Sequence, residues 1–168
     1  SLMIGSHDNT FLTHLECSAC GAFHDHGSVQ SVCIGCGKPL LARYDLSHVR
    51  DVLSRDQIAH RAATMWRYRE VLPVIRTGNI VSFGEGFSPI VPLKRLANEL
   101  GLEAVAVKDE ALNPTGSFKA RGLAMAVSKA KELGLTELCI PTAGNAGGAL
   151  AAYAAMAGLR SHVYMPAD

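Results

Sequence analysis

A lysine at position 119 stands where helix electrostatics disfavour one, which marks it as a candidate functional residue. Residues 108–122 read KDEALNPTGSFKARG and lie between an apolar run and an alanine-rich segment with helical spacing. This context places Lys119 in the first turn of a helix, where the helix dipole repels an ammonium group. A local rule that is broken without structural gain is typical of a functional site. An amine held there suits Schiff-base chemistry, and a solvated lysine at a helix start is the alternative.

A glycine-rich turn supplies a second group of candidate residues. Residues 141–148 read PTAGNAGG and contain Asn145. Backbone N–H groups exposed at 144–148 would form an anion site suited to a carboxylate or a phosphate. In a parallel sheet the loops at the carboxyl ends of strands meet, so we expect this turn beside Lys119. A lysine, an amide and an anion site together favour a carbonyl cofactor such as pyridoxal phosphate.

Two cysteine pairs near the N-terminus predict a metal site. Each pair has the pattern CxxCG, and the four cysteines are Cys17, Cys20, Cys33 and Cys36. Two residues between thiolates let both sulfurs face one ion, and the glycine permits the tight turn. Because four thiolates leave no open coordination position, we expect a structural zinc ion. An iron ion, or ligation by His24 or His26, stays open as an alternative.

The overall composition limits the classes of partner. The chain has 168 residues, with 16 basic and 15 acidic side chains, and this near neutrality argues against a nucleic-acid partner. No segment has the apolar length of a membrane span, and no signal peptide is visible. Metal-binding cysteines fit a reducing compartment. We therefore expect a cytoplasmic protein that binds neither nucleic acid nor membrane.

The elements that must position these residues form an α/β pattern. The expected order is strand 104–107, helix 118–133, strand 137–140, helix 149–157 and strand 161–165. Such alternation with short turns predicts a parallel sheet with right-handed crossovers. Gly134 and Gly158 are expected to end the two helices. Cys139 is expected to be a small core residue of its strand.

Four regions follow from these patterns. Residues 1–13 are expected to be a tag remnant and flexible N-terminus, 14–46 a zinc-ribbon-like module, 47–92 a helical linker and loop, and 93–168 an incomplete pyridoxal-phosphate-binding α/β domain. In the linker, Ser47 is a candidate N-cap and Trp66 belongs to an apolar stripe that should pack on the main domain. A short helix at 93–100 should end at Gly101. The GEG sequence at 84–86 permits close backbone approach but is a weak signal.

Several motifs together resemble the threonine synthases, a family of tryptophan-synthase-β-like, fold-type-II pyridoxal-phosphate enzymes. Besides the cysteine pairs and the lysine motif, these are MWRYREVLP at 65–73, GEGFSPIVPL at 84–93 and PTAGNAGGALAAYAA from position 141. They occur in order over nearly the whole chain. The resemblance implies a parallel-sheet, three-layer fold and a lyase that converts O-phosphohomoserine and water into threonine and phosphate, in threonine biosynthesis.

The resemblance also implies residue roles. Lys119 would hold the cofactor covalently and then move protons on the amino-acid substrate, with Phe118 beside the cofactor. Asn145 would hydrogen-bond the hydroxyl of the pyridine ring. The substrate carboxylate would be received by Thr142, Ala143, Gly144 and Ala146. A core aromatic at position 118 and an ordinary N-cap at position 142 are the alternatives.

Some features depart from the family pattern. Alanine at 120 replaces the acid of SFKDRG, and alanines at 143 and 146 replace residues with hydroxyl groups. These changes weaken the substrate assignment, so a dehydratase or ammonia-lyase acting on another substituted amino acid is an alternative, as is a non-catalytic zinc-ribbon binding module. No cofactor-phosphate loop is found before Asp168. We therefore expect the N-terminal portion of a longer, homodimeric enzyme, without turnover alone.

Overall fold

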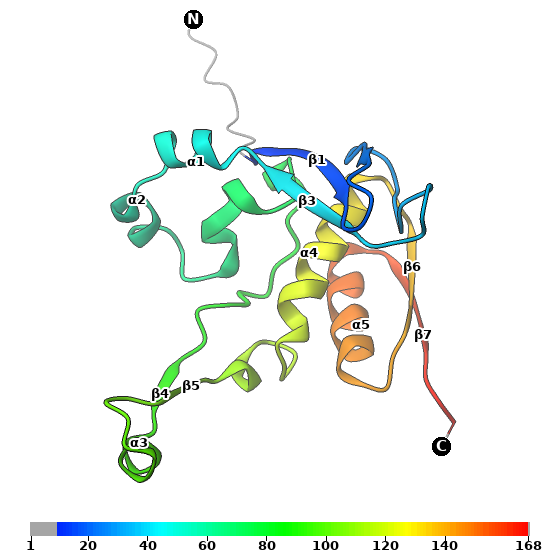
Figure 1. Cartoon of the computed structure of the whole chain (residues 1–168). Helices are drawn as coiled ribbons and strands as arrows, with labels where there is room; N and C mark the ends of the chain where they lie inside the picture. The colour runs from blue at the N-terminus through cyan, green and yellow to red at the C-terminus, as the bar shows by residue number, and fades with distance from the viewer. Residues whose placement is uncertain (1–9, 168) are drawn as a thin grey trace, which may run out of the picture.

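The computed structural model of the chain describes residues 10–167 and has a mixed α/β architecture (Figure 1). The first nine residues, which include most of the predicted tag remnant and flexible N-terminus, lie outside the described residues. A small antiparallel sheet comes first, then short helices, then a lobe that projects from the body, and finally two long helices beside a pair of strands. In the part of the chain that the structure describes, no helix has the length and apolar character that a membrane crossing requires.

The N-terminal sheet has three antiparallel strands in the order β2-β1-β3. Its strands are β1 (Leu12–Cys17), β2 (Phe23–His24) and β3 (Leu40–Tyr44). Glu16 on β1 is opposite Leu41 on β3, and its carboxylate accepts a hydrogen bond of 2.8 Å from the guanidinium of Arg43. The two cysteine pairs lie in the turns of this sheet, so the sheet fixes their separation.

Short helices connect this sheet to the rest of the molecule. They are α1 (Leu46–Val52), α2 (Arg55–Ala59), and the 3₁₀ segments η1 (Met65–Val71) and η2 (Thr77–Asn79). The prediction of Ser47 as N-cap is wrong. The helix already includes Ser47, and the cap is Asp45, whose carboxylate accepts a hydrogen bond of 3.0 Å from the backbone N–H of His48.

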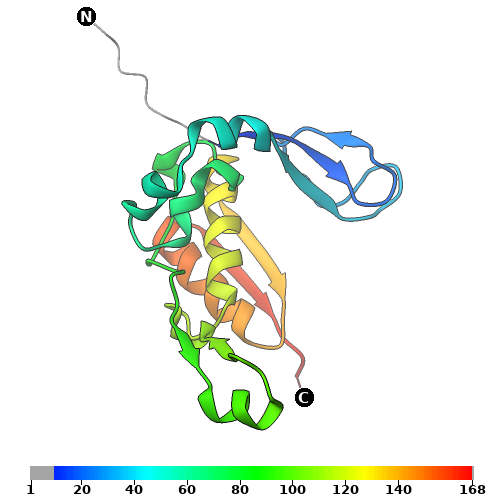
Figure 2. The ribbon, with the colours of Figure 1, turned by 60° about the vertical axis from the view of Figure 1, so that its left-hand side comes forward.

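A lobe formed by a two-stranded antiparallel sheet and one helix projects away from the body (Figures 1 and 2). Its elements are β4 (Ile90–Pro92), α3 (Lys94–Leu100), β5 (Ala106–Lys108) and the following 3₁₀ turn η3 (Glu110–Leu112). Gly101 ends α3 in the left-handed conformation, as predicted. The expectation that strand 104–107 belongs to a parallel sheet is wrong, because β5 pairs with β4. All three residues of β5 are exposed, whereas an inner strand of a parallel sheet is buried on both faces.

The main body contains one parallel βαβ unit and an additional long helix. Its elements are α4 (Lys119–Glu132), β6 (Glu137–Pro141), α5 (Asn145–Ala157) and β7 (Arg160–Tyr164). Strands β6 and β7 are parallel, with Cys139 opposite His162. Cys139 is exposed, so its prediction as a core residue is wrong. Gly158 ends α5 as predicted.

Helix α5 begins at Asn145, four residues earlier than predicted. The glycines of the PTAGNAGG sequence indicated a turn, but Gly147 and Gly148 lie inside the first turn of the helix. Gly147 is needed for packing, since a Cβ atom there would lie 2.6 Å from Cγ1 of Val163 and 3.0 Å from Cγ2 of Thr142. The glycine therefore lets α5 approach β7 closely.

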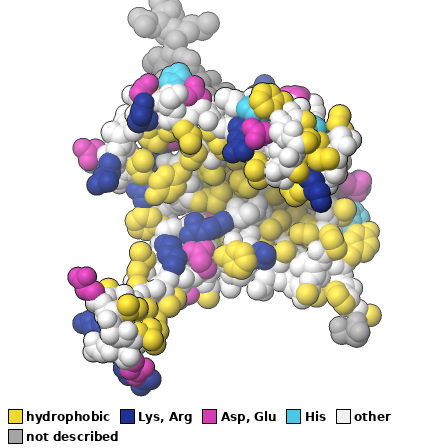
Figure 3. All heavy atoms as spheres, viewed as in Figure 1, with side chains coloured by type: hydrophobic (Ala, Val, Ile, Leu, Met, Phe, Trp, Pro, Cys, Tyr) yellow, Lys and Arg dark blue, Asp and Glu magenta, His cyan; other side chains and the backbone are white. Residues whose placement is uncertain are grey.

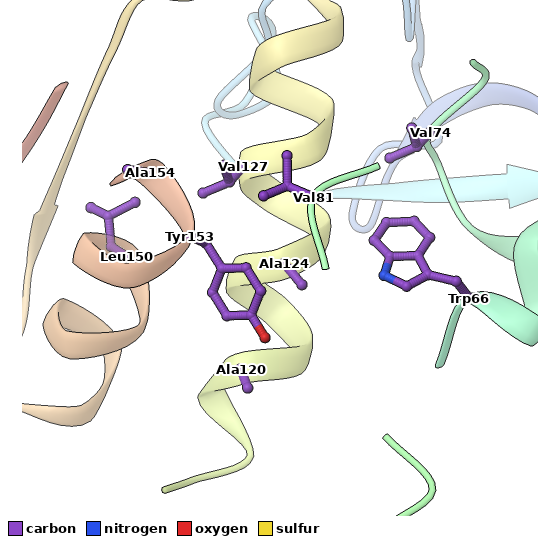
Figure 4. Packing of buried hydrophobic residues seen from close by; sticks show 9 residues of the cluster. All are labelled: Trp66, Val74, Val81, Ala120, Ala124, Val127, Leu150, Tyr153 and Ala154. Carbon is purple, nitrogen blue, oxygen red and sulfur yellow. The ribbon is translucent and has the colours of Figure 1, made fainter. Parts of the chain in front are cut away.

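The core lies between α4, α5 and the segment that runs from η1 past η2 (Figure 4). Small side chains on α4 recur at helical spacing, at Ala120, Ala124 and Val127, and all are fully buried. Tyr153 from α5 packs against them. Trp66 is buried in the same cluster and Met65 packs against it, whereas α1 and α2 have no buried residue. The prediction that the apolar stripe packs on the main domain is therefore confirmed at Met65 and Trp66 alone.

A buried carboxylate joins three segments of this core. Glu85 has no exposed surface, and it accepts hydrogen bonds from the side chains of Trp66 (2.6 Å), Tyr153 (2.6 Å) and Ser82 (2.9 Å) and from the backbone N–H of Phe83 (3.0 Å). Burial, followed by the hydrogen bond to Glu85, raises the pKa of the Tyr153 phenol. Four donors compensate the cost of removing this charge from water.

Removal of one of these donors is expected to destabilise the fold. Tyr153→Phe leaves the buried carboxylate with one partner fewer, and the free energy of unfolding should fall by about 1–3 kcal/mol. Urea denaturation followed by circular dichroism measures this change. The control is Tyr164→Phe, since the side chain of Tyr164 is exposed and its loss should change stability by less than about 0.5 kcal/mol. Equal effects of the two substitutions would contradict the role given to Glu85.

Candidate functional site

Lys119 is the first residue of α4, so it lies in the first turn as predicted, although the helix begins one residue after the predicted start. The helix lacks a side-chain cap, and a tight turn with Gly116 at φ +71° leads into it. The backbone N–H of Lys119 donates to Oγ of Ser117 at 3.3 Å. The side chain is half-buried, and its Nζ lies 4.5 Å from the centroid of the Phe118 ring. Phe118 is 57% exposed, so the alternative of a core aromatic at this position is wrong.

The turn before α5 has a different geometry from the predicted anion site. The backbone N–H groups of Gly147 and Gly148 both donate to the carbonyl of Gly144, at 2.8 and 3.2 Å. Within the described residues, the N–H groups of Asn145 and Ala146 have no acceptor. Of the N–H groups at 144–148 that were predicted to bind an anion, only those of the first two helix residues, Asn145 and Ala146, are therefore free to do so.

Thr142 stabilises the turn that leads into α5. It follows β6 directly, its backbone N–H donates to the carbonyl of Tyr164 at 2.9 Å, and its Oγ1 accepts from the N–H of Gly144 at 3.2 Å. The helix N-cap is Gly144, so the alternative of Thr142 as N-cap is wrong. The hydroxyl of Thr142 keeps its own hydrogen for a further acceptor.

The two helix starts lie at the same end of the molecule. Helices α4 and α5 pack against each other and run in the same direction, and both views show their first turns together at the lower end of the body (Figures 1 and 2). Lys119 and Phe118 therefore lie at the same end as the turn of Thr142, Ala143 and Asn145. Two aligned helix N-termini place backbone donors and positive ends of dipoles around one region.

A charged network holds the loop before Lys119. The guanidinium of Arg121 donates to both carboxylate oxygens of Glu110, at 2.6 and 2.8 Å, and the Asn113 amide donates to the same carboxylate at 2.9 Å. These bonds, Arg121 first, lower the pKa of Glu110 to about 2. The Asn113 side chain also accepts from the N–H of Gly86 at 3.0 Å, which connects the lysine loop to the GEG loop.

Sequence reasoning missed the positioning role of this network and of Glu85. The signal for Glu110, Asn113 and Arg121 was present, because all three lie within the lysine motif at 108–122. For Glu85 it was only the pair of flanking glycines. The structure shows why Gly86 is required: its φ is +100°, and a Cβ atom would lie 2.6 Å from the backbone nitrogen of Met65.

The four predicted metal ligands come together at the N-terminal sheet. Cys17, Cys20, Cys33 and Cys36 have Sγ atoms within 4.8 Å of one another, and they form the only group of potential metal ligands found in residues 10–167. The closest sulfur pairs are 3.4, 3.7 and 3.7 Å apart. Tetrahedral zinc–sulfur bonds of about 2.3 Å give sulfur separations of about 3.8 Å. The cluster could thus hold a metal ion, whereas its identity as a zinc ribbon stays a prediction.

The backbone around the cluster favours thiolates and tight turns. Gly21 and Gly37 follow the two pairs with φ of +72° and +69°, and each N–H donates to the carbonyl of the first cysteine of its pair. Hydrogen bonds from the backbone N–H groups of Cys20 and then Ala19 lower the pKa of the Cys17 thiol to about 6. Backbone hydrogen bonds at Ala22 and Lys38 act in the same direction on Cys20 and Cys36, but contacts with neighbouring sulfurs, Cys17 first, leave the pKa of both thiols raised. Only Cys17 is therefore prepared as a thiolate by the backbone.

Comparison with known proteins adds a family to this geometry. Residues 81–168, which include the GEG loop, Lys119 and Asn145, match the family model described as pyridoxal-phosphate dependent enzyme. The chain belongs to this family. The matched residues include the first turns of both α4 and α5.

Curated relatives include several threonine synthases. The chain is 38% identical to that of Methanocaldococcus jannaschii over 151 residues, which is 90% of this chain and 37% of the relative. It is 37% identical to that of Methanosarcina acetivorans over 92% of this chain and 37% of the relative. For Halalkalibacterium halodurans the identity is 46% over 61% of this chain and 30% of the relative. The chain covers about a third of the length of these curated relatives.

The metal prediction is tested by elemental analysis. Purified protein is expected to contain about one zinc ion per chain, and Cys17→Ser should lose it together with the folded state of the N-terminal sheet. Cys139→Ser is the matched control, because that cysteine is exposed and lies outside the cluster. Finding neither zinc nor iron in the parent protein would overturn the four-thiolate site.

The network around Glu110 predicts a dependence of stability on acid. The folded-state pKa of about 2 lies below the ordinary value of 4.5, so the stabilisation is complete above pH 4.5 and is lost as the pH falls towards 2. Glu110→Gln should lower stability at neutral pH and make the decrease below pH 4.5 shallower. Urea midpoints across this pH range measure the effect, with the exposed Glu103→Gln as control. A Glu110→Gln profile parallel to the parent would contradict it.

Proposed function

We propose that this chain carries the reactive lysine of a threonine-synthase-like lyase that depends on pyridoxal phosphate. The reaction would convert O-phosphohomoserine and water into threonine and phosphate. The observation that carries the proposal is the position of Lys119 at the start of α4, at the same end as the free N–H groups of α5, within the region that matches the family. The relatives named threonine synthase support the choice of reaction.

The residues of this chain fit the cofactor. Lys119 offers a half-buried amine at a fixed helix start, the exposed ring of Phe118 lies beside it, and the exposed side chain of Asn145 begins the next helix. When bound, pyridoxal phosphate supplies an aldehyde for covalent attachment and a ring that withdraws electrons from the substrate. We propose that Lys119 attaches the cofactor and later transfers protons. Phe118 would lie beside the cofactor ring, and Asn145 would orient the ring by a hydrogen bond to its hydroxyl group.

The substrate carboxylate is assigned to the turn before α5. The free N–H groups of Asn145 and Ala146 give two donors at a positive helix end, and the hydroxyl of Thr142 can add a third. Ala143 and Gly144 complete the turn. A carboxylate bound there would present the amino end of the substrate to the lysine at the neighbouring helix start.

A second candidate reaction is favoured by one observation. Ala143 and Ala146 have no hydroxyl groups for a substrate phosphate or carboxylate. A dehydratase or ammonia-lyase acting on another substituted amino acid needs fewer such donors and is the alternative within the same chemistry. The non-catalytic alternative, a zinc-ribbon module that binds a partner, receives no support from the family match.

The remaining features of the whole protein are also proposals. We propose a structural zinc ion at the four cysteines, a module boundary near residue 46 and the start of the cofactor domain near residue 93. We further propose a small amino-acid substrate, a homodimer, a cytoplasmic location and turnover by a polypeptide of the relatives' length. Each extends the family membership to properties of the complete enzyme.

Cofactor attachment is the decisive experiment. Addition of pyridoxal phosphate to the full-length protein should produce a visible absorption band, and borohydride should fix the cofactor on the peptide that contains Lys119. Lys119→Ala should lose both signals because the attacking amine is absent. Lys131→Ala, a substitution of an exposed lysine at the other end of α4, should keep them. A band that persists in Lys119→Ala would refute the assignment.

The same spectra separate the two candidate reactions. O-phosphohomoserine should change the band and release inorganic phosphate if the chain belongs to a threonine synthase. If serine or threonine instead changes the band and yields a keto acid and ammonia, the dehydratase alternative is correct.

A further inference from the structure

A cavity of about 290 Å³ lies between η1, the GEG loop, β5 and the start of α4. Its walls carry three cations, Arg67, Lys108 and Arg121, together with the aromatic rings of Tyr68 and Phe87. Figure 3 shows basic side chains gathered around an acidic one in the hollow between the upper body and the projecting lobe. The cavity is thus open to solvent and lined by three cations.

Arg67 gives the strongest indication of a ligand. It is only 9% exposed, and its Nη2 donates to the carbonyls of Ile58 and Ala59. Its Nε is buried and has no hydrogen-bond partner within residues 10–167. Its guanidinium carbon lies 5.0 Å from the centroid of the Phe87 ring. A buried cation with an unpaired donor is costly unless an anion compensates it.

The charges around the cavity do not balance. Glu110 is the partner of Arg121, and the ammonium of Lys108 donates to the uncharged carbonyl of Ser88. In the described part of the chain, neither Arg67 nor Lys108 forms an ion pair with a carboxylate. Two of the three cations are therefore available to a negatively charged ligand.

The cavity is separate from the surroundings of Lys119. Residues two positions apart on a helix point in directions that differ by about 200°, so Arg121 and Lys119 face opposite sides of α4. The backbone of Phe87 supports a functional role for the cavity. Its φ of +52° makes it the one non-glycine residue with positive φ in the described chain, and such strain concentrates at ligand sites.

We propose that this cavity binds a phosphate group, free or esterified, at a site distinct from the lysine centre. Guanidinium and ammonium groups together are the usual recognition groups for phosphate, and Arg67 and Lys108 supply one of each. The exposed face of Phe87 would accommodate an attached apolar or aromatic group. The proposal extends beyond the proposed reaction and does not depend on it.

Binding of inorganic phosphate to the full chain tests the proposal. Calorimetric titration should give saturable binding, and Lys108→Met should weaken the affinity about tenfold because one charged hydrogen bond is lost. Lys131→Met is the matched control, since that ammonium also donates to a backbone carbonyl, Gly78 at 3.2 Å, but far from the cavity along α4. Arg67→Met should abolish binding, and circular dichroism shows whether that variant is folded.

Further titrations identify the ligand class and the site. If adenosine monophosphate and glycerol phosphate bind as tightly as inorganic phosphate, the site recognises the phosphate alone. If the nucleotide binds more tightly and Phe87→Ala removes only that gain, the site recognises a nucleotide. Lys119→Ala should leave phosphate affinity unchanged while it removes the cofactor band. Unchanged affinity in Lys108→Met, equal loss in Lys131→Met, or loss in Lys119→Ala would overturn the proposal.

Discussion

The buried carboxylate of Glu85 is the constraint on which the positions of both helix starts depend. A charge without access to water is stable only if its donors are held in place, and its donors come from η1, from its own loop and from α5. The next residue, Gly86, donates to Asn113 in the lysine loop. One loop of the chain therefore connects the segment before Lys119 to the helix that begins at Asn145.

Small side chains between α4 and α5 also fix the positions of the two helix starts. Ala120, Ala124 and Ala154 have no exposed surface where α4 and α5 pack together, and their size permits a close approach of the helices. Gly147 does the same between α5 and β7. Because the helices run side by side in the same direction, close packing also brings their N-termini together. The site geometry is thus a consequence of core packing as much as of loop sequence.

The features that the sequence predicted correctly are those with local causes. Gly101 and Gly158 end their helices because each adopts the left-handed conformation there, and the start of α4 at Lys119 follows from the turn before it. The cysteine cluster follows from two repeated CxxCG turns. The predictions that failed depend on distant partners. The strand at 104–107 pairs with β4, and Gly147, which was read as part of a turn, serves helix packing.

Glu85 is the clearest case of a residue whose role depends on partners distant in sequence. Its side-chain partners Trp66 and Tyr153 are 19 and 68 residues away in sequence, so no local pattern identifies it as the centre of a network. The candidate site residues Thr142 and Asn145 could be named from their motif. Which backbone N–H groups are free to bind an anion could not be predicted, because this depends on the residue at which α5 begins, and packing against β7 decides that position.

The first turn of α4 explains why one residue of the lysine motif can differ from the family. Successive residues of a helix point about 100° apart, so positions 119, 120 and 121 meet three different environments. Lys119 is half-buried at the helix start, Ala120 is fully buried in the core, and Arg121 pairs with Glu110. Rotation of the turn would break the ion pair and the core contact together. The lysine is thus oriented by the two residues that follow it. Alanine at 120 keeps charge out of the core, and the ion pair of Arg121 holds the rotation of the turn.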